Sequence, residues 1–177
     1  MTIAAGPFAI AATLLVVAGA FKAARPADTA NALGALGVPA PRLLVRAGAV
    51  VECAIGLAAL ISGDAISATL VGLSYVVFLV FVLEALRRHA PISSCGCFGK
   101  VDTPPSWLHV IVNLGSVAAS VAVVLQPGAG LLAAVRSQPL SGAPYLLLVG
   151  TGAGLALLVL SAHVRNLALV RQPQVAR

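Results

Sequence analysis

The chain has 177 residues, of which 60% are hydrophobic and 9% are charged, and its formal net charge is +6. Soluble globular domains carry roughly 25% charged residues, so this composition excludes an ordinary soluble domain. Lys and Arg lie at or beyond the ends of the apolar runs, which indicates a role in membrane topology and argues against nucleic acid as a partner. The sequence therefore predicts an all-α integral membrane helical bundle in a lipid bilayer, forming a single membrane domain over residues 1–177.

Apolar runs close to the ~20 residues that cross a hydrocarbon layer predict four to five transmembrane helices. The expected spans are about 3–24, 43–62, 65–86, 107–126 and 144–162. Residues 25–42 contain Pro, Asn and Gly and are expected to form a connector. The second and third spans are joined only by Gly63 and Asp64, which predicts an antiparallel helical hairpin.

The second span carries a carboxylate, Glu52, near its middle, where a charge is costly unless it faces other helices or finds a donor. Gly48 and Gly56 lie four residues to either side and would let a neighbouring helix approach the carboxyl group. Arg46 lies about 120° away around the helix, so we do not expect it to pair with Glu52. We interpret Glu52 as a proton or ligand site, with a structural interhelical hydrogen bond as the alternative. Cys53 is interpreted as a packing residue rather than a second redox group.

The segment 87–104 contains Cys95 and Cys97, separated by Gly96. Cα atoms two residues apart lie about 5.5–7 Å from each other, whereas a disulfide needs about 4.4–6.8 Å, so these cysteines can bridge only if the chain turns. Gly96 supplies the backbone freedom for that turn. A ring this small would be strained and easily reduced, which predicts an exchanging, redox-active pair rather than a structural disulfide.

Two other interpretations of these cysteines remain open. They could be inert small residues in a loop at the membrane surface. Alternatively, Cys95 and Cys97, together with His89 or His109, are soft donors suited to Cu(I) or Zn(II), although the spacing is not a common zinc pattern. No cofactor is predicted, and a quinone or a metal ion would be compatible with the sequence. A third alternative is a small proton-linked transporter in which Glu52 is the working residue.

The fourth span carries a polar stripe, because four polar residues recur at steps of four, three and four and so share one helical face. These residues are His109, Asn113, Ser116 and Ser120. We expect the stripe to turn inward, to face Glu52 and to place His109 near the cysteines as an acid–base group. The alternative is simple hydrogen bonding between helices. In the fifth span, Gly150 and Gly154 form a G-x-x-x-G pattern, which is weak evidence for a homodimer.

The string Cys95-Gly96-Cys97-Phe98-Gly99-Lys100, between the third span and a fourth span containing Trp and Asn, resembles the MauE family of methylamine utilisation proteins, which is related to DoxX-like small membrane proteins. The run from Arg46 through Glu52 to Gly56-Leu57 is similar to the Arg…Glu…Gly-Leu pattern of those families. The resemblance covers about residues 5–126. It implies a four- or five-helix membrane protein that acts, with a thioredoxin-like partner, in thiol redox maturation of a cysteine-rich exported protein such as an amine dehydrogenase subunit.

The distribution of Lys and Arg predicts a multi-pass protein of the cell membrane with its N-terminus outside and its C-terminus in the cytoplasm. In the five-span arrangement this places Cys95 and Cys97 at the cytoplasmic face, where thiols are kept reduced. Maturation of an exported protein takes place on the other side. A cytoplasmic position of the cysteines is compatible with maturation on the other side if electrons cross the bilayer or if the segment re-enters the membrane.

The combined prediction is a component of thiol–disulfide oxidoreduction. Cys95 and Cys97 are expected to exchange with a thioredoxin-fold protein through a mixed disulfide, while Glu52 and His109 handle protons or shape the core.

Overall fold

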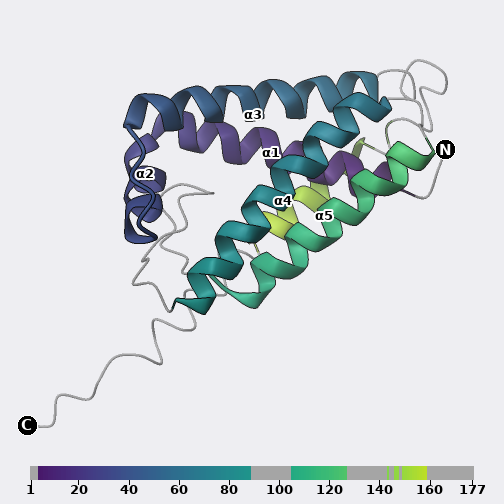
Figure 1. The fold of residues 1–177 in the computed structure, drawn as a ribbon. Coiled ribbons are helices and arrows are strands. Elements are labelled where there is room, and N and C mark those ends of the chain that lie inside the picture. Colours follow the sequence, from purple (N-terminus) through teal and green to yellow (C-terminus); the bar gives the residue numbers. More distant parts are fainter. Residues whose placement is uncertain (1–3, 89–104, 127–142, 144–145, 148, 159–177) are drawn as a thin grey trace, which may run out of the picture.

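The structure is a computed structural model that describes residues 4–88, 105–126, 143, 146–147 and 149–158. Throughout these ranges the regular elements are helices. The long elements are α1 (Ala5–Ala24), α2 (Pro26–Ala35), α3 (Arg42–Ser62), α4 (Ala65–Arg87) and α5 (Trp107–Leu125) (Figure 1). Four of them, α1, α3, α4 and α5, are long and apolar enough to cross a membrane. The prediction of an all-α integral membrane bundle is confirmed.

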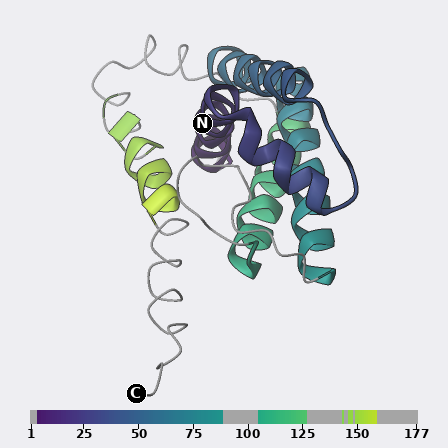
Figure 2. The same cartoon turned by 90° about the vertical axis from the view of Figure 1, so that its left-hand side faces the viewer.

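α1, α3, α4 and α5 begin and end within two residues of the first four expected spans. A fifth apolar helix, Val149–Leu158, lies inside the expected span 144–162, whose other residues are mostly outside the described ranges. Gly152 of this helix lies against Ile10 of α1, and Figure 2 shows the helix on the α1 side of the bundle.

α1 is the central helix. It packs against α3 along its length and also contacts α4 and α5, while α4 and α5 form a second closely packed pair. In the 18-residue apolar stretch of each helix that could cross a membrane, 50% of α1 is buried, compared with 17% of α3. α3 therefore presents most of its surface to the lipid. The core is made of side chains from α1, α3, α4 and α5: Phe8, Ala11, Ala12, Leu15, Ala59, Ala68, Val71, Tyr75, Ala119 and Val123.

The α3–α4 hairpin is closed by the two residues that the sequence indicated. Gly63 ends α3 in the left-handed conformation, with φ of +59°, which favours glycine. Asp64 then caps α4: its Oδ1 accepts a hydrogen bond from the backbone N–H of Ser67 at 2.6 Å. The turn is short because each of its residues satisfies a helix end.

The segment 25–42 contains a helix, α2, where the sequence predicted only a connector. Pro26 starts it, because a proline is tolerated in the first turn of a helix. Ala32 and Leu36 are buried against Phe81 and Ala85 of α4. This tertiary contact, rather than intrinsic helix propensity, accounts for the helix.

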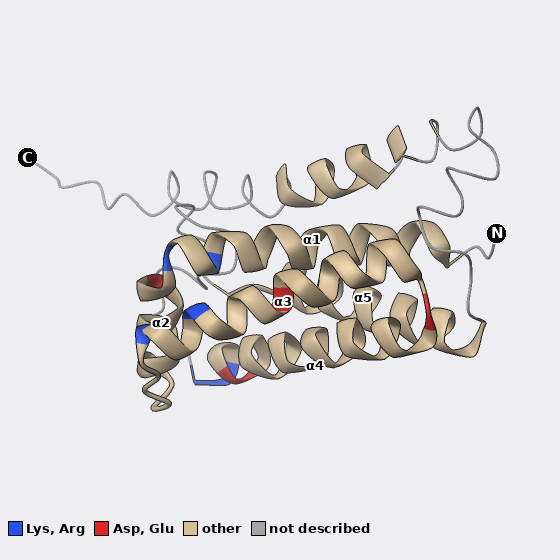
Figure 3. Cartoon of the chain, turned by 90° about the horizontal axis from the view of Figure 1, so that it is seen from above, with Lys and Arg blue, Asp and Glu red and all other residues tan. Residues whose placement is uncertain are grey.

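α2 ends in a Schellman motif. The N–H of Val38 bonds to the carbonyl of Leu33, the N–H of Gly37 bonds to that of Gly34, and Gly37 has φ of +80°. α2 crosses the end of the bundle at which α1 ends, α3 begins and α4 ends (Figure 1). That end of the bundle also carries every Lys and Arg that the structure describes (Figure 3).

Candidate functional site: a buried ion pair between three helices

Glu52 lies ten residues from either end of α3, about 15 Å along the axis, so the carboxylate sits at mid-depth in the bundle. It forms an ion pair with Lys22 of α1. The Lys22 side chain is 5% exposed and that of Glu52 is 21% exposed, so the charges are largely withdrawn from the surroundings. The ammonium is the ion-pair partner of the buried Oε2, and no other hydrogen-bond donor among the described residues reaches that oxygen.

Small residues bring the two backbones together around this pair. A Cβ placed on Gly19 of α1 would lie 2.7 Å from the carbonyl oxygen of Ala49, and one on Gly56 of α3 would lie 2.9 Å from that of Ala12. Both distances are too short for real Cβ contacts. Gly56 therefore has the role that the sequence predicted, whereas Gly48 faces open space. The close approach of α1 and α3 puts Lys22 within reach of Glu52.

The third helix at this site is α4. The ammonium of Lys22 lies 4.1 Å from the centroid of the Phe78 ring, a cation–π contact. Phe78 packs edge-to-face on Tyr75, with centroids 5.8 Å apart. The Tyr75 hydroxyl in turn donates to the carbonyl oxygen of Ala11 in α1 at 2.7 Å. Lys22 thus has an anion on one side and an aromatic face on the other, and both help to compensate its desolvation.

The polar stripe of α5 does turn inward: His109, Asn113, Ser116 and Ser120 are all buried. The hydroxyl of Ser120 bonds to the carbonyl of Ser116 at 2.9 Å, and His109 Nδ1 lies 2.8 Å from the hydroxyl of Ser106. α5 packs chiefly on α4 and next on α1, whereas α3 packs chiefly on α1. The carboxylate of Glu52 forms its ion pair with Lys22 of α1, and the expectation that the stripe faces Glu52 stays a prediction.

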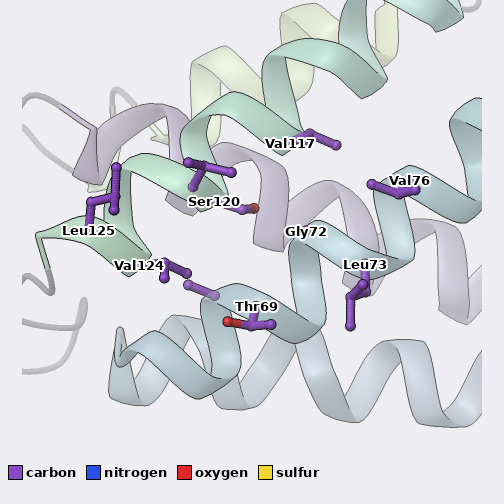
Figure 4. A pocket seen from close by; sticks show the side chains of 10 residues that line it. Thr69, Gly72, Leu73, Val76, Val117, Ser120, Val124 and Leu125 are labelled. Atoms are coloured by element: carbon purple, nitrogen blue, oxygen red, sulfur yellow. The ribbon is translucent and has the colours of Figure 1, made fainter.

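α4 and α5 also line an open apolar pocket of about 280 Å³ near the end of the bundle where α5 ends. Its walls include Gly72, Leu73, Val76 and Val117, and only the hydroxyls of Thr69 and Ser120 are polar (Figure 4). Each of these hydroxyls already bonds to a carbonyl of its own helix. The pocket therefore offers apolar surface and no free polar group of its own.

Cys53 lies in the α1–α3 interface. Its thiol donates to the carbonyl oxygen of Val16, with the sulfur 3.3 Å from that oxygen, and it packs close to Gly19. These contacts support its interpretation as a packing residue. Arg46 does not pair with Glu52: its Nε donates to the carbonyl oxygen of Ala23 at 2.9 Å.

His89, Cys95 and Cys97 lie outside the described residues, so the redox pair and its metal-binding alternative stay predictions. Among the residues that are described, no three His, Cys, Asp or Glu side chains lie together in a way that could hold a metal ion. The segment 89–104 follows Arg88 and precedes Pro105, and both of these residues are described.

The family model of the methylamine utilisation protein MauE matches residues 1–126. The chain belongs to this family. The match covers α1 to α5 and the Cys95–Lys100 string, and membership implies involvement in methylamine utilisation. The helix Val149–Leu158 lies beyond the matched residues. No curated protein and no solved structure matches the chain.

Lys22 is the residue at this site that sequence reasoning missed, because its place near the end of a span suggested only a topological role. A usable signal existed: a carboxylate at mid-depth requires a cation on a neighbouring helix. Helical side chains point toward the helix N-terminus, so Lys22, close to the end of α1, reaches back into the bundle toward Glu52.

Proposed function

We propose that this member of the MauE family supports thiol–disulfide exchange with a thioredoxin-fold partner during maturation of an exported protein, with an amine dehydrogenase subunit as the substrate. The observation that carries the proposal is that the family match includes Cys95 and Cys97, two of the three cysteines in the chain and the closely spaced pair. Cys53, the third, already has a packing role between α1 and α3.

The helices that flank the cysteine segment limit where the pair can act. α4 ends and α5 begins at the end of the bundle that carries α2 and the basic residues (Figures 1 and 3). Cys95 follows Arg88 by seven residues, which span at most about 25 Å. α4 itself has 23 residues and is about 34 Å long. The proposal therefore confines exchange with the partner to the basic end of the bundle.

The exchange between the cysteine pair and the partner's disulfide needs no further oxidant or reductant. The thiolate of one cysteine attacks the partner's disulfide, forming a mixed disulfide and releasing one partner thiolate. The second cysteine then attacks the mixed disulfide, which releases the partner as a dithiol and leaves the Cys95–Cys97 disulfide. Two electrons pass from this chain to the partner, and the same steps run in reverse reduce the pair.

His109 and Glu52 are proposed to serve proton movement. His109 lies in the first turn of α5, the helix that follows the cysteine segment, and its imidazole is buried beside Ser106. It is proposed to take the proton of the attacking thiol. Glu52 is proposed as a proton site beside the ammonium of Lys22. By the positive-inside rule, we propose that the basic end, and the cysteine segment with it, faces the cytoplasm, with the N-terminus outside and the C-terminus inside. Because maturation of the exported protein takes place on the other side of the membrane, this orientation requires electrons to cross the bilayer.

The decisive experiment is capture of the mixed disulfide. In cells, Cys95→Ser and Cys97→Ser are each expected to interrupt exchange. The variant that keeps the attacking thiol but lacks the second thiol should accumulate a reductant-sensitive adduct with a thioredoxin-fold protein. The adduct is detected on non-reducing gels after acid quenching. Cys53→Ser is the matched control and should leave adduct formation unchanged. The metal-binding alternative would replace the proposal if neither variant formed an adduct and if purified wild-type protein contained a metal ion that both substitutions removed.

Orientation has its own test. A membrane-impermeant thiol reagent is applied to intact cells, before and after reduction, using the Cys53→Ser background so that only Cys95 and Cys97 can react. We expect no labelling from outside and reductant-dependent labelling in opened cells. Labelling of intact cells would contradict the proposed orientation while leaving the exchange chemistry open to the capture experiment.

A further inference from the structure

The arginines at the basic end differ in what they contact. Arg88 forms an ion pair with Glu84 and also donates to the carbonyl of Leu36. Lys22 is buried against Glu52. Arg25, Arg42 and Arg46, by contrast, are exposed, and no carboxylate among the described residues lies within 4 Å of their guanidinium groups. The acidic residue closest to them in sequence, Asp28 in the first turn of α2, forms no such ion pair in the described part of the chain.

These three arginines are brought together by the packing of α1 against α3. Arg46 donates to the carbonyl oxygen of Ala23, two residues before Arg25, which directly follows α1. Arg42 lies one turn before Arg46 on the same side of α3 and is the first residue of that helix. The result is a concentration of positive charge at two adjoining helix ends, the depth at which phospholipid headgroups lie.

Apolar side chains continue this surface toward the bilayer centre. From Arg46, steps of about one helical turn along α3 reach Val50 and Leu57, which are 56% and 50% exposed. On α1, Phe21 lies one turn before Arg25 and is 44% exposed. Both helices therefore place an arginine above exposed apolar surface.

We propose that Arg25, Arg42 and Arg46 bind the phosphodiester of an anionic phospholipid whose acyl chain lies along the exposed apolar face of α3. The charge complementarity carries the assignment: guanidinium groups that pair with no carboxylate in the described part of the chain match phosphate oxygens, and the apolar continuation matches an acyl chain rather than a free ion. The inference does not depend on the thiol chemistry, since none of these residues is placed in that site.

The test is native mass spectrometry of the purified, delipidated full chain in detergent, titrated with phosphatidylglycerol or phosphatidylcholine. The wild-type protein should prefer phosphatidylglycerol, and Arg42→Gln/Arg46→Gln should weaken its binding roughly tenfold. Arg42→Lys/Arg46→Lys keeps the charge and should retain most of the preference. Arg87→Gln removes the same type of charge from an exposed position on α4 and serves as the matched control, expected to change binding by less than about twofold.

Three outcomes would overturn the inference. One is a wild-type protein with no preference for phosphatidylglycerol. Another is an equal loss in Arg87→Gln, which would indicate a diffuse charge effect rather than a site. The last is displacement of the lipid by millimolar inorganic phosphate, which would indicate a free-anion site. Circular dichroism of each variant shows whether it retains its helices, so that loss of binding is not confused with unfolding.

Discussion

The two helix pairs of this bundle solve the same packing problem in different ways. In the α1–α3 pair, glycines bring the backbones so close that a Cβ would collide with a carbonyl, and a buried ion pair lies across the contact. In the α4–α5 pair, Gly72 approaches only a side chain, with Ser120 Cβ 3.1 Å from the position of an added Cβ. Ser116 and Ser120 of α5 carry no charge, and the Ser120 hydroxyl bonds to its own helix.

The difference shows which polar groups couple helices in a membrane. A neutral hydroxyl can satisfy itself on the preceding turn of its own helix, so its burial need not link two helices. In the middle of a helix the backbone N–H groups are already bonded, so a carboxylate there needs a donor side chain, and Glu52 finds it on another helix. Glu52 therefore defines a specific pairing of α1 with α3, whereas the serines of α5 are compatible with several.

The largest effect is expected at the ion pair. Glu52→Leu leaves the Lys22 ammonium buried without its anion, and the expected loss in the free energy of unfolding is about 3 kcal/mol. Lys22→Met/Glu52→Leu removes both charges and should recover most of that loss. Ser120→Ala, in the other pair, should cost about 1 kcal/mol or less. Denaturant titration in detergent, followed by circular dichroism, measures all three. If Glu52→Leu lowered the free energy of unfolding no more than Ser120→Ala does, the contrast between the two helix pairs would be refuted.

The next effect concerns the glycines. Gly19→Ala should lower the free energy of unfolding by about 1–3 kcal/mol, because its Cβ would lie 2.7 Å from the carbonyl oxygen of Ala49, a backbone atom that cannot move alone. Gly72→Ala should cost less, since it meets a side chain. Gly48→Ala is the matched control: nothing lies within 4 Å, so stability should stay the same or rise slightly through helix propensity. Thermal unfolding of the three variants ranks them, and equal losses for Gly19 and Gly48 would refute the close approach.

The smallest effect lies at the turn that joins the two pairs. The backbone N–H of Ser67 donates to the Asp64 carboxylate and lowers the pKa of that group. Because the folded-state pKa lies below the unfolded one, the capping contribution is present above the unfolded value of about 3.9 and is lost as pH falls through the lowered folded value. Asp64→Asn keeps a capping side chain that does not titrate. Between pH 5 and pH 2 the wild-type protein should lose stability relative to this variant, and parallel curves would contradict the assignment.

Much of the fold could be predicted from the sequence, for a physical reason that particular elements illustrate. The four long helices coincide with apolar runs because hydrocarbon demands internally bonded backbone over a set length. The turn at Gly63 and Asp64 was visible because those residue types satisfy helix ends locally. α2 was not visible, because its stability comes from Ala32 and Leu36 packing on a helix about 50 residues away.

The candidate site was likewise predictable only in part from the sequence. The sequence by itself determined that a carboxylate lies at mid-depth, that it needs a donor, and that the polar side of α5 turns inward, because these follow from hydropathy and helical period. Only the tertiary structure decided that Lys22 is the donor and that Phe78 covers it. Which helix approaches which depends on how small residues from distant segments fit together, and that fit is a property of the assembled bundle rather than of any one span.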